Sequence, residues 1–386
     1  MNYKFKTIPK NLNKPEGLCY YGKLDQNTID ILSKNHFLIK EETNFTDIYF
    51  TKKSNMNIFK NNTTFNYMDG FSPNTNKELH IGHFSNLIIA KAFNKLGVCK
   101  KVIAMFGDTL EGTVSNEKGL KLAYSLFKKF NYSISKVFFA SKLKYKGKLE
   151  EGTGNYDNTK IININDSKVV MVKSTGKTSY LYHDVALASK LNKPTLYLTG
   201  YEQKEHFNNL KTLFPNIVHL YLGLVKLNNS KMSSSEGNVI LIKDLLEELN
   251  KTFKNYKLSY NVFAGYILKS SPSSDKKIDF DKINEHKNSL GLYLSYTTAR
   301  YLKAGCFYIP FINNNKKLQY SYIQSLNNLD PSILFNELIE YCKYLNILYS
   351  VIKIKGNIIN RLKMSIKVSI LIYYTKKLGL YTIKKV

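Results

Sequence analysis

Arginine is nearly absent from this chain of 386 residues: it occurs only at Arg300 and Arg361, both in the last third of the sequence. A guanidinium group binds phosphates and carbonyl groups through a planar fork of donors that the lysine ammonium group does not reproduce. Because the residue is so scarce, we single out Arg300 and Arg361 as positions to consider when a binding surface is sought.

Cysteine, long apolar runs and targeting segments are scarce as well. The four cysteines lie far apart and form no CxxC pair, which argues against a zinc site or a disulfide framework and indicates reduced thiols in an intracellular protein. No apolar run reaches the roughly 18 residues that a membrane-spanning helix needs. The first residues lack the apolar core of a secretory signal, and Pro9 and Pro15 would interrupt the helix of a transit peptide.

Acidic residues are the minority of the charged residues: 57 lysines and arginines face 29 aspartates and glutamates, and the net charge is +28. An excess of this size suits a polyanionic partner, above all a nucleic acid. Nearly all of the basic residues are lysine, however, and the chain is rich in Asn, Ile, Lys and Tyr, as an AT-rich coding sequence would make it whatever the function. Charge alone therefore leaves both explanations open.

Composition and periodicity divide the chain into three parts. Residues 1–62 form a short polar N-terminal appendage with a weak helical pattern and one candidate strand. Residues 63–285 alternate apolar strands with helical stretches, which predicts a parallel sheet covered by helices, that is, a Rossmann-like α/β domain. Residues 286–386 are predicted to be all helix and, from residue 291 on, carry 14 basic against three acidic residues, which predicts a basic helical bundle suited to RNA.

The elements of the α/β part are predicted from apolar runs and from three- and four-residue spacings. A polar, glycine-containing stretch at residues 142–160 predicts an inserted loop or hairpin. Parallel sheets of this kind bind ligands beyond the carboxyl ends of their strands. Strands are expected at residues 65–68, 102–106, 169–172, 195–198 and 218–222, and helices at residues 83–96, 183–191 and 203–213.

The segment from Ser72 to His83 lies where a strand gives way to a helix and ends in His-Ile-Gly-His. Backbone N–H groups at a helix N-terminus attract phosphate oxygens, and two imidazoles three residues apart, from His80 and His83, can donate hydrogen bonds to a triphosphate. Gly82 has no side chain and lets a flat base approach the backbone. Taken alone, such a tetrapeptide is equally well explained by two unrelated surface histidines.

A second segment, residues 231–238, reads Lys-Met-Ser-Ser-Ser-Glu-Gly-Asn. A lysine in a loop of small residues can close over a pyrophosphate leaving group. Taken alone, this segment is better explained as an ordinary exposed loop. Both segments together, separated by the βα units of a nucleotide-binding sheet, are a strong indication of ATP chemistry.

In this order and spacing the two segments resemble the HIGH box and the KMSKS loop of class I aminoacyl-tRNA synthetases, and within that class the chain is most similar to arginyl-tRNA synthetase. The resemblance covers roughly residues 65–386. Further segments that carry it are Ser72-Pro73-Asn74 with Lys77, GKTSYLYHD at residues 176–184, GYEQKEHF at residues 200–207, and YLSYTTAR at residues 293–300.

The resemblance implies an arginine–tRNA ligase that forms arginyl-AMP and transfers arginine to the 3′ end of tRNA(Arg). It implies ATP, Mg²⁺, L-arginine and tRNA(Arg) as cofactors and partners, no resident metal, no membrane, and a cytoplasmic monomer. By position, the ATP-handling residues are Lys77, His80, Gly82, His83, Lys231 and Ser233. The arginine-binding residues are Asp69, Asn74, Tyr180, Asp184 and Gln203, and the tRNA-binding residues are Tyr293, Tyr296, Arg300 and Arg361.

The arginine assignment also has a chemical reason. A guanidinium needs planar acceptors and carboxylates satisfy it best, so Asp69 and Asp184 form the expected pair. Taken singly, each aspartate is more commonly a turn or helix-cap residue. In the second segment Ser234 occupies the place of the class's second lysine, and Lys77 is expected to supply the missing charge.

The sequence departs from the family pattern at several positions. Family arginines are replaced by Ser85, His183 and Ser235, the family's Gly-Asp-Trp-Gly is changed at residues 107–110, and the N-terminal appendage is shorter than usual. These changes bear on the catalytic rate and on tRNA affinity. They leave open a synthetase-derived RNA-binding protein with reduced or no ligase activity. The paired acids leave open a second alternative, a class I synthetase for lysine, because they suit any cationic substrate.

Overall fold

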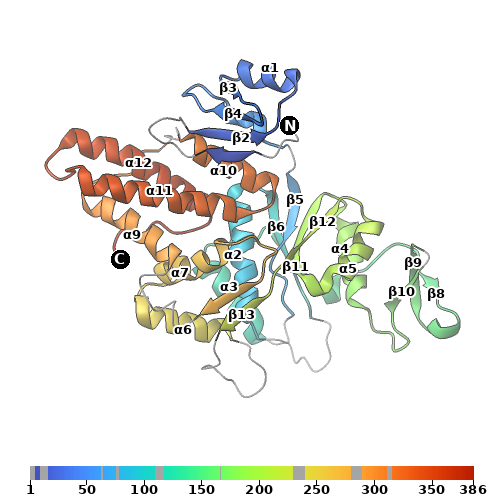
Figure 1. The fold of residues 1–386 in the computed structure, drawn as a ribbon. Coiled ribbons are helices and arrows are strands. Elements are labelled where there is room, and N and C mark those ends of the chain that lie inside the picture. The colour runs from blue at the N-terminus through green and yellow to red at the C-terminus, as the bar shows by residue number, and fades with distance from the viewer. Residues whose placement is uncertain are drawn as a thin grey trace. The chain divides into compact units, whose positions relative to one another are not determined.

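Two compact units make up the chain in its computed structural model. The sheet unit comprises residues 64–289, and the helical unit comprises residues 1–63 together with residues 290–386. Each is described by itself (Figure 1). The structure describes residues 5–8, 16–61, 64–74, 78–108, 117–165, 167–228, 240–279, 289–310 and 315–386.

The sheet unit is built on five parallel strands in the spatial order β12-β11-β5-β6-β7 (Figure 1). The earliest of them in the sequence, β5, lies in the middle, so the strand order reverses there. Thr195 to Leu198 of β11 are all buried, the pattern of a strand covered on both faces. The strands are β5 (Phe65–Asp69), β6 (Cys99–Phe106), β7 (Lys136–Phe139), β11 (Thr195–Gly200) and β12 (Ile217–Leu222).

The reversal of strand order determines where a ligand can bind. In open α/β sheets the crevice lies beyond the carboxyl ends of the strands at the point where their order reverses. Here β5 ends at Asp69 and β11 ends at Gly200, and Tyr197 pairs with Asp69 across the two strands. The segments that follow both strands therefore start from the same edge of the sheet.

Helix α2 (Ile81–Leu96) follows β5 and contacts the sheet. His80 caps its N-terminus, and Gly97, in the left-handed conformation with φ of 92°, ends it. Most of the helix is buried because it also packs on helix α7 (Tyr256–Leu268), where Phe84 stacks on Phe263. The helix predicted at residues 83–96 is confirmed and begins two residues earlier.

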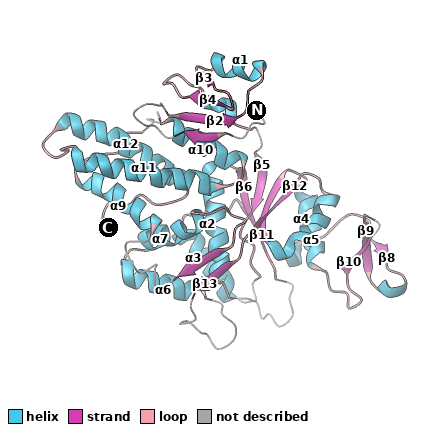
Figure 2. Ribbon diagram, in the orientation of Figure 1, coloured by secondary structure: helices cyan, strands magenta, loops and turns pink. Residues whose placement is uncertain are grey.

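Helices also connect the other strands of the unit, as Figure 2 shows in cyan. Short 3₁₀ turns occupy residues Ala140–Lys142, Gly154–Tyr156 and Tyr201–Gln203. The strands predicted at residues 65–68, 102–106, 195–198 and 218–222 and the helices predicted at residues 183–191 and 203–213 are confirmed. The remaining elements are α3 (Glu117–Lys129), α4 (Tyr180–Leu191), α5 (Lys204–Leu213), α6 (Ile242–Phe253) and the parallel pair β13 (Val225–Asn228) and β14 (Lys276–Asp279).

The strand predicted at residues 169–172 lies in a different sheet from the one expected. It belongs to β10 (Ser167–Val172), which pairs antiparallel with β9 (Lys160–Ile164), and β9 pairs with β8 (Glu150–Glu151). The physical reason is packing. Met171 is buried in a core with Val185 of α4, so this apolar run is buried without being a strand of the parallel sheet. The insertion expected at residues 142–160 is thus part of a three-stranded antiparallel sheet.

The helical unit combines a small antiparallel sheet with long helices. The sheet has the strand order β1-β2-β4-β3. None of the helices that the structure describes, in either unit, is long and apolar enough to cross a membrane. The elements are β1 (Lys6–Ile8), β2 (Gly17–Tyr21), α1 (Gln26–Lys34), β3 (Leu38–Glu41), β4 (Phe45–Tyr49), a 3₁₀ turn at Met56–Phe59, α9 (Leu290–Lys303), α10 (Lys316–Asn327), α11 (Pro331–Val351) and α12 (Ile358–Lys377).

One hydrophobic core in the helical unit joins two ends of the chain. Phe59 packs edge-to-face on Tyr320 of α10, with ring centroids 5.4 Å apart. Asn327 Nδ2 donates to the Phe59 carbonyl at 2.6 Å, and Lys316 Nζ donates to the Ser54 carbonyl at 2.7 Å. The N-terminal segment and the C-terminal helices therefore share one compact unit, whereas the division into three domains stays a prediction.

Candidate active site

A cavity of about 550 Å³ lies at the carboxyl edge of the parallel sheet, within the sheet unit. Three carboxylates line it, from Asp69, Asp184 and Glu202, and the described lining includes no lysine or arginine. A wall of this charge suits a cationic ligand. The sequence-predicted residues that line it are Asp69, Asn74, His80, Gly82, His83, Tyr180, Asp184 and Gln203.

Asp69 is the last residue of β5 and is buried in the wall of the cavity. The Ser72 hydroxyl donates to Asp69 Oδ1 and accepts from the backbone N–H of Met105 at 2.8 Å. Burial, with the nearby Asp184 carboxylate adding repulsion, raises the pKa of Asp69 to about 7. Asp69 is therefore partly protonated at neutral pH, and a bound cation would favour its ionised form.

Asn74 reaches the cavity from the turn after β5. It forms an isolated parallel bridge with Gly107, which follows β6, and the Gly107 N–H donates to the Pro73 carbonyl at 3.3 Å. A Cβ atom at position 107 would collide with the side-chain oxygen of Asn74. Glycine at this position therefore allows the Asn74 amide to lie against the end of β6.

His80 and His83 are fixed by the first turn of α2. The Gly82 N–H donates to His80 Nδ1 at 3.2 Å, the His80 N–H donates to His83 Nδ1 at 3.1 Å, and the ring centroids are 3.9 Å apart. Because both Nδ1 atoms accept, each neutral ring carries its proton on Nε2. A Cβ atom at position 82 would lie 3.0 Å from His80 Cε1, so glycine also leaves room for this ring.

Residues 79–81 are tied to the chain that follows the Lys231 segment. The Ile81 N–H donates to the Ile240 carbonyl at 2.9 Å, and the Ile242 N–H donates to the Leu79 carbonyl at 2.9 Å. The chain at residues 240–242, which directly follows the Lys-Met-Ser-Ser-Ser segment at residues 231–238, therefore lies beside His80. The predicted site residues Lys77, Lys231 and Ser233 themselves lie outside the described residues.

Helix α4 contributes the second carboxylate, and α5 contributes its hydrogen-bond partner. Ser179 caps α4 by accepting from the Tyr182 N–H at 3.3 Å, and Asp184 follows one turn later. Asp184 Oδ2 lies 2.7 Å from Nε2 of His206, a residue of α5. Tyr180, with 56% of its surface exposed, and Gln203, which immediately precedes α5, complete the polar part of this wall.

Curated sequence relatives of the chain are named arginine–tRNA ligases. The Lactobacillus johnsonii protein is 27% identical over 190 residues, which cover 41% of this chain and 33% of that protein. The Borrelia duttonii protein is 23% identical over a 392-residue alignment that covers 70% of this chain and 66% of that protein. The chain is a homologue of the arginine–tRNA ligases. It spans less than two thirds of the length of these relatives, and no family model matches it.

Solved structures extend the similarity to the fold. Arginyl-tRNA synthetase from Thermus thermophilus has a TM-score of 0.66 at 12% identity, with 99% of this chain and 96% of that chain covered. The enzyme from Plasmodium falciparum also has a TM-score of 0.66, at 16% identity, with 100% and 96% covered. The predicted Rossmann-like α/β domain followed by a helical region is thereby confirmed.

Two residues that form hydrogen bonds to the cavity carboxylates were not assigned a role in the sequence analysis. Ser72 bonds to Asp69, and His206 bonds to Asp184. Both stand inside segments that resemble the arginyl-tRNA synthetase family, and that was their only signal. Ser72 is three residues from its partner and His206 is 22 residues from its partner, and sequence separation alone predicts neither contact.

His183 directly precedes Asp184, at a position where the resemblance described above implies an arginine. It is buried, lines the cavity and has its Nε2 2.8 Å from the Thr178 hydroxyl. Burial lowers the pKa of His183, so the imidazole is neutral at neutral pH. A neutral ring rather than a positive charge therefore lies beside Asp184.

The sequence-predicted tRNA contacts lie in the helical unit. On α9, Tyr296 is 49% exposed and the Arg300 guanidinium carbon lies 5.9 Å from the centre of its ring. Asn346 of α11 joins this group because it accepts from Arg300 Nη1 at 3.3 Å and donates to the Tyr293 hydroxyl at 2.9 Å. Arg361 is exposed on α12. The structure therefore brings Tyr293, Tyr296 and Arg300 onto one helix and places Arg361 on another.

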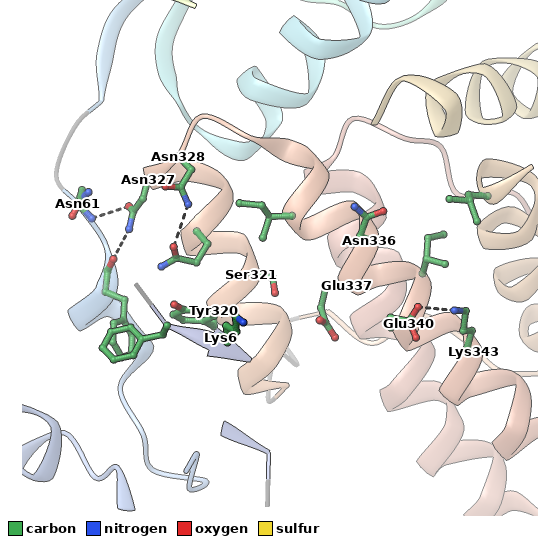
Figure 3. A pocket seen from close by; sticks show the side chains of 16 residues that line it. Lys6, Asn61, Tyr320, Ser321, Asn327, Asn328, Asn336, Glu337, Glu340 and Lys343 are labelled. Carbon is green, nitrogen blue, oxygen red and sulfur yellow. Dashed lines mark hydrogen bonds and ion pairs between the residues drawn. The ribbon is translucent and has the colours of Figure 1, made fainter. Parts of the chain in front are cut away.

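The helical unit also contains a larger cavity, of about 1060 Å³ (Figure 3). Two hydrogen bonds lie along its wall: the backbone N–H of Asn61 donates to Asn327 Oδ1 at 2.9 Å, and Asn328 Nδ2 donates to Gln324 Oε1 at 3.2 Å. Glu340 pairs with Lys343 at 2.6 Å on the opposite side. None of the sequence-predicted site residues belongs to the described lining of this cavity.

Proposed function

We propose that the chain is an arginine–tRNA ligase, which activates L-arginine with ATP and transfers it to tRNA(Arg). The observation that supports this is the presence, in one cavity, of two carboxylates, from Asp69 and Asp184, and of a histidine pair at a helix N-terminus. The carboxylates suit a guanidinium, and the histidines with the helix N-terminus suit phosphates. The named activity of the sequence relatives points the same way.

The arginine side chain is proposed to bind between Asp69 and Asp184. Burial, with a smaller contribution from repulsion by Asp184, raises the pKa of Asp69, and a guanidinium would favour the ionised form of both carboxylates. Asn74, Tyr180 and Gln203 supply neutral contacts from the same cavity wall. Lysine would meet the same charge but cannot form two parallel hydrogen bonds to one carboxylate.

The ATP phosphates are proposed to bind at the N-terminus of α2. The Nε2–H groups of His80 and His83 supply donors there, and Lys77, Lys231 and Ser233 are proposed to add contacts from outside the described residues. The described residues contain no group of three or more candidate metal ligands. In the proposal, Mg²⁺ is bound as the complex that it forms with the phosphates of the substrate ATP.

In the proposed first step, the arginine carboxylate attacks the α-phosphate of ATP in line, and the bond to pyrophosphate breaks. The protein supplies position and charge neutralisation rather than a nucleophile. His80, His83 and the proposed lysines stabilise the departing pyrophosphate. In the second step, the 2′-hydroxyl of the terminal tRNA ribose attacks the adenylate carbonyl, and AMP leaves.

The helical region from residue 286 is proposed to bind the anticodon stem and loop, as the third of three domains. Unpaired bases stack on tyrosine rings and guanidinium planes, and Tyr293, Tyr296, Arg300 and Arg361 offer both. The net positive charge of this region suits the RNA backbone. A monomeric state and a cytoplasmic location are expectations that accompany this proposal.

Arginine-dependent exchange of pyrophosphate into ATP, measured with and without tRNA(Arg), tests the proposal. We expect exchange with arginine and none with lysine, and we expect Asp184→Ala to lose the exchange while its circular dichroism spectrum stays that of the wild type. Folded protein that shows no exchange with cognate tRNA present would overturn the proposal. Lysine-dependent exchange that Asp184→Ala abolishes would reassign the substrate, and failure to bind ATP in calorimetry would indicate an RNA-binding protein instead.

A further inference from the structure

One oxygen of Asp184 is occupied by a hydrogen bond within the protein. Nε2 of His206 lies 2.7 Å from Asp184 Oδ2, and a carboxylate can only accept, so the imidazole donates. The side chains of His206 and Asp184 are 22% and 14% exposed, and both line the cavity. The contact is therefore formed at the surface of the cavity rather than in the core.

The other carboxylate of the cavity is held in the same way. The Ser72 hydroxyl donates to Asp69 Oδ1, and Ser72 is in turn held by the Met105 N–H at 2.8 Å. In both aspartates one oxygen is thus fixed by a side chain of the protein.

The imidazole of His206 is itself supported from the sheet. Its ring lies 5.1 Å from the Phe207 ring, Phe207 stacks on His219 at 4.4 Å, and His219 Nε2 lies 2.8 Å from the Thr199 hydroxyl near the end of β11. These contacts join α5 to β11 and β12. His206 therefore has a fixed position relative to the end of the strand that borders the cavity.

We propose that His206 is a positioning residue for the cationic amino acid, because its Nε2 fixes the orientation of the Asp184 carboxylate. The inference rests on the proposed function of the cavity. A guanidinium binds a carboxylate in a planar geometry, so the plane of the carboxylate must be set before binding for the contact to form without loss of side-chain freedom. His206 acts through Asp184 and does not contact the substrate.

The inference predicts a change in KM for arginine but not in kcat. The side chain of the substrate lies away from the reacting carboxylate, so its binding contributes equally to the ground state and the transition state. Loss of the Asp184 orientation should then raise KM for arginine by roughly tenfold and leave kcat within about twofold. KM for ATP should not change, because His80 and His83 belong to another element.

The test compares His206→Gln, His206→Asn and His206→Ala in the full chain. The side-chain amide of glutamine places its nitrogen near the position of Nε2, whereas that of asparagine places it near Nδ1. His206→Gln should therefore keep a low KM for arginine, and His206→Asn and His206→Ala should both show the increase. Equal KM values for all three variants and the wild type, or an increase in His206→Gln as large as in His206→Ala, would overturn the inference.

A double-mutant cycle distinguishes failure of this inference from failure of the proposed function. Unfolding free energies are measured for the wild type, His206→Ala, Asp184→Ala and the double variant, which requires no catalytic activity. A wild type without arginine activation, but with a coupling between the two residues, would refute the proposed function and with it the role toward arginine. An active wild type with no coupling and an unchanged KM in His206→Ala would refute the inference alone.

Discussion

At the scale of single residues, the ionised form of Asp69 is destabilised by its burial in the cavity wall. Its pKa is raised from an ordinary value of 3.8 to about 7 by burial and by Asp184. The folded chain thus binds this proton more tightly than the unfolded chain does. The contribution of Asp69 to stability therefore falls as the pH rises from about 4 to about 7. Destabilising groups of this kind are common where a site is shaped for a ligand.

Replacement of Asp69 by asparagine should therefore stabilise the sheet unit while it removes arginine activation. The amide keeps an acceptor for Ser72 but carries no charge. We expect the unfolding free energy at pH 8 to exceed that of the wild type by about 2 kcal/mol, and the difference to shrink toward pH 5. Urea unfolding followed by circular dichroism at both pH values measures this. A variant less stable than the wild type at pH 8 would contradict the charge argument.

At the scale of elements, two glycines act for different physical reasons. Gly97 ends α2 with φ of 92°, and nothing lies within 4 Å of the position that its Cβ would take. Gly107, which follows β6, is instead needed for the close approach of Asn74. The first glycine serves the backbone conformation, and the second serves the placement of a cavity side chain.

Alanine at position 107 should therefore affect arginine binding, whereas alanine at position 97 should affect stability. Gly107→Ala displaces the Asn74 amide, so we expect KM for arginine to rise roughly tenfold with a stability change below about 1 kcal/mol. Gly97→Ala strains the left-handed backbone far from the ligand, so it should lose about 1 kcal/mol of stability and keep the wild-type KM. Exchange kinetics and thermal unfolding of both variants provide the comparison. If Gly97→Ala altered KM as strongly as Gly107→Ala, the assignment of Asn74 would fail.

At the scale of the whole molecule, the helical unit depends on segments from both ends of the chain. The buried ring of Tyr320, on α10, packs on Phe59 and shares a core with Leu18 and Ile48 of the N-terminal sheet. Burial across such a core makes the N-terminal strands and the C-terminal helices stabilise each other. Neither part buries this apolar surface by itself.

Tyr320→Ala should accordingly destabilise the N-terminal strands as well as α10. We expect a loss of about 3 kcal/mol in unfolding free energy, from lost burial and the cavity that remains. Tyr320→Phe, the matched control, keeps the ring and should cost less than about 1 kcal/mol. Limited proteolysis with mass spectrometry locates the exposed sites. Cleavage of Tyr320→Ala confined to the C-terminal helices would show that the two segments fold independently.

Local pattern was sufficient to place most elements of the parallel sheet and the helical region. The run at residues 102–106 lies within β6, and the spacing of apolar residues at 83–96 lies within α2. The antiparallel placement of β10 was beyond such reasoning because an apolar strand has the same pattern in either kind of sheet. Membership of the N-terminal segment in the helical unit likewise depends on contacts more than two hundred residues apart in sequence, such as Asn61 with Asn327.

The sequence by itself determined which residues could meet a cation and which could meet phosphates, because residue type and motif spacing limit the chemistry that a segment can perform. Residue type and position indicated His80 and His83, and the resemblance to arginyl-tRNA synthetases added Asp69 and Asp184. Only the tertiary structure decided that these side chains line one cavity, and that His206 holds Asp184. The physical reason is that hydrogen bonds and pKa shifts depend on distance and burial in space, and separation along the chain determines neither.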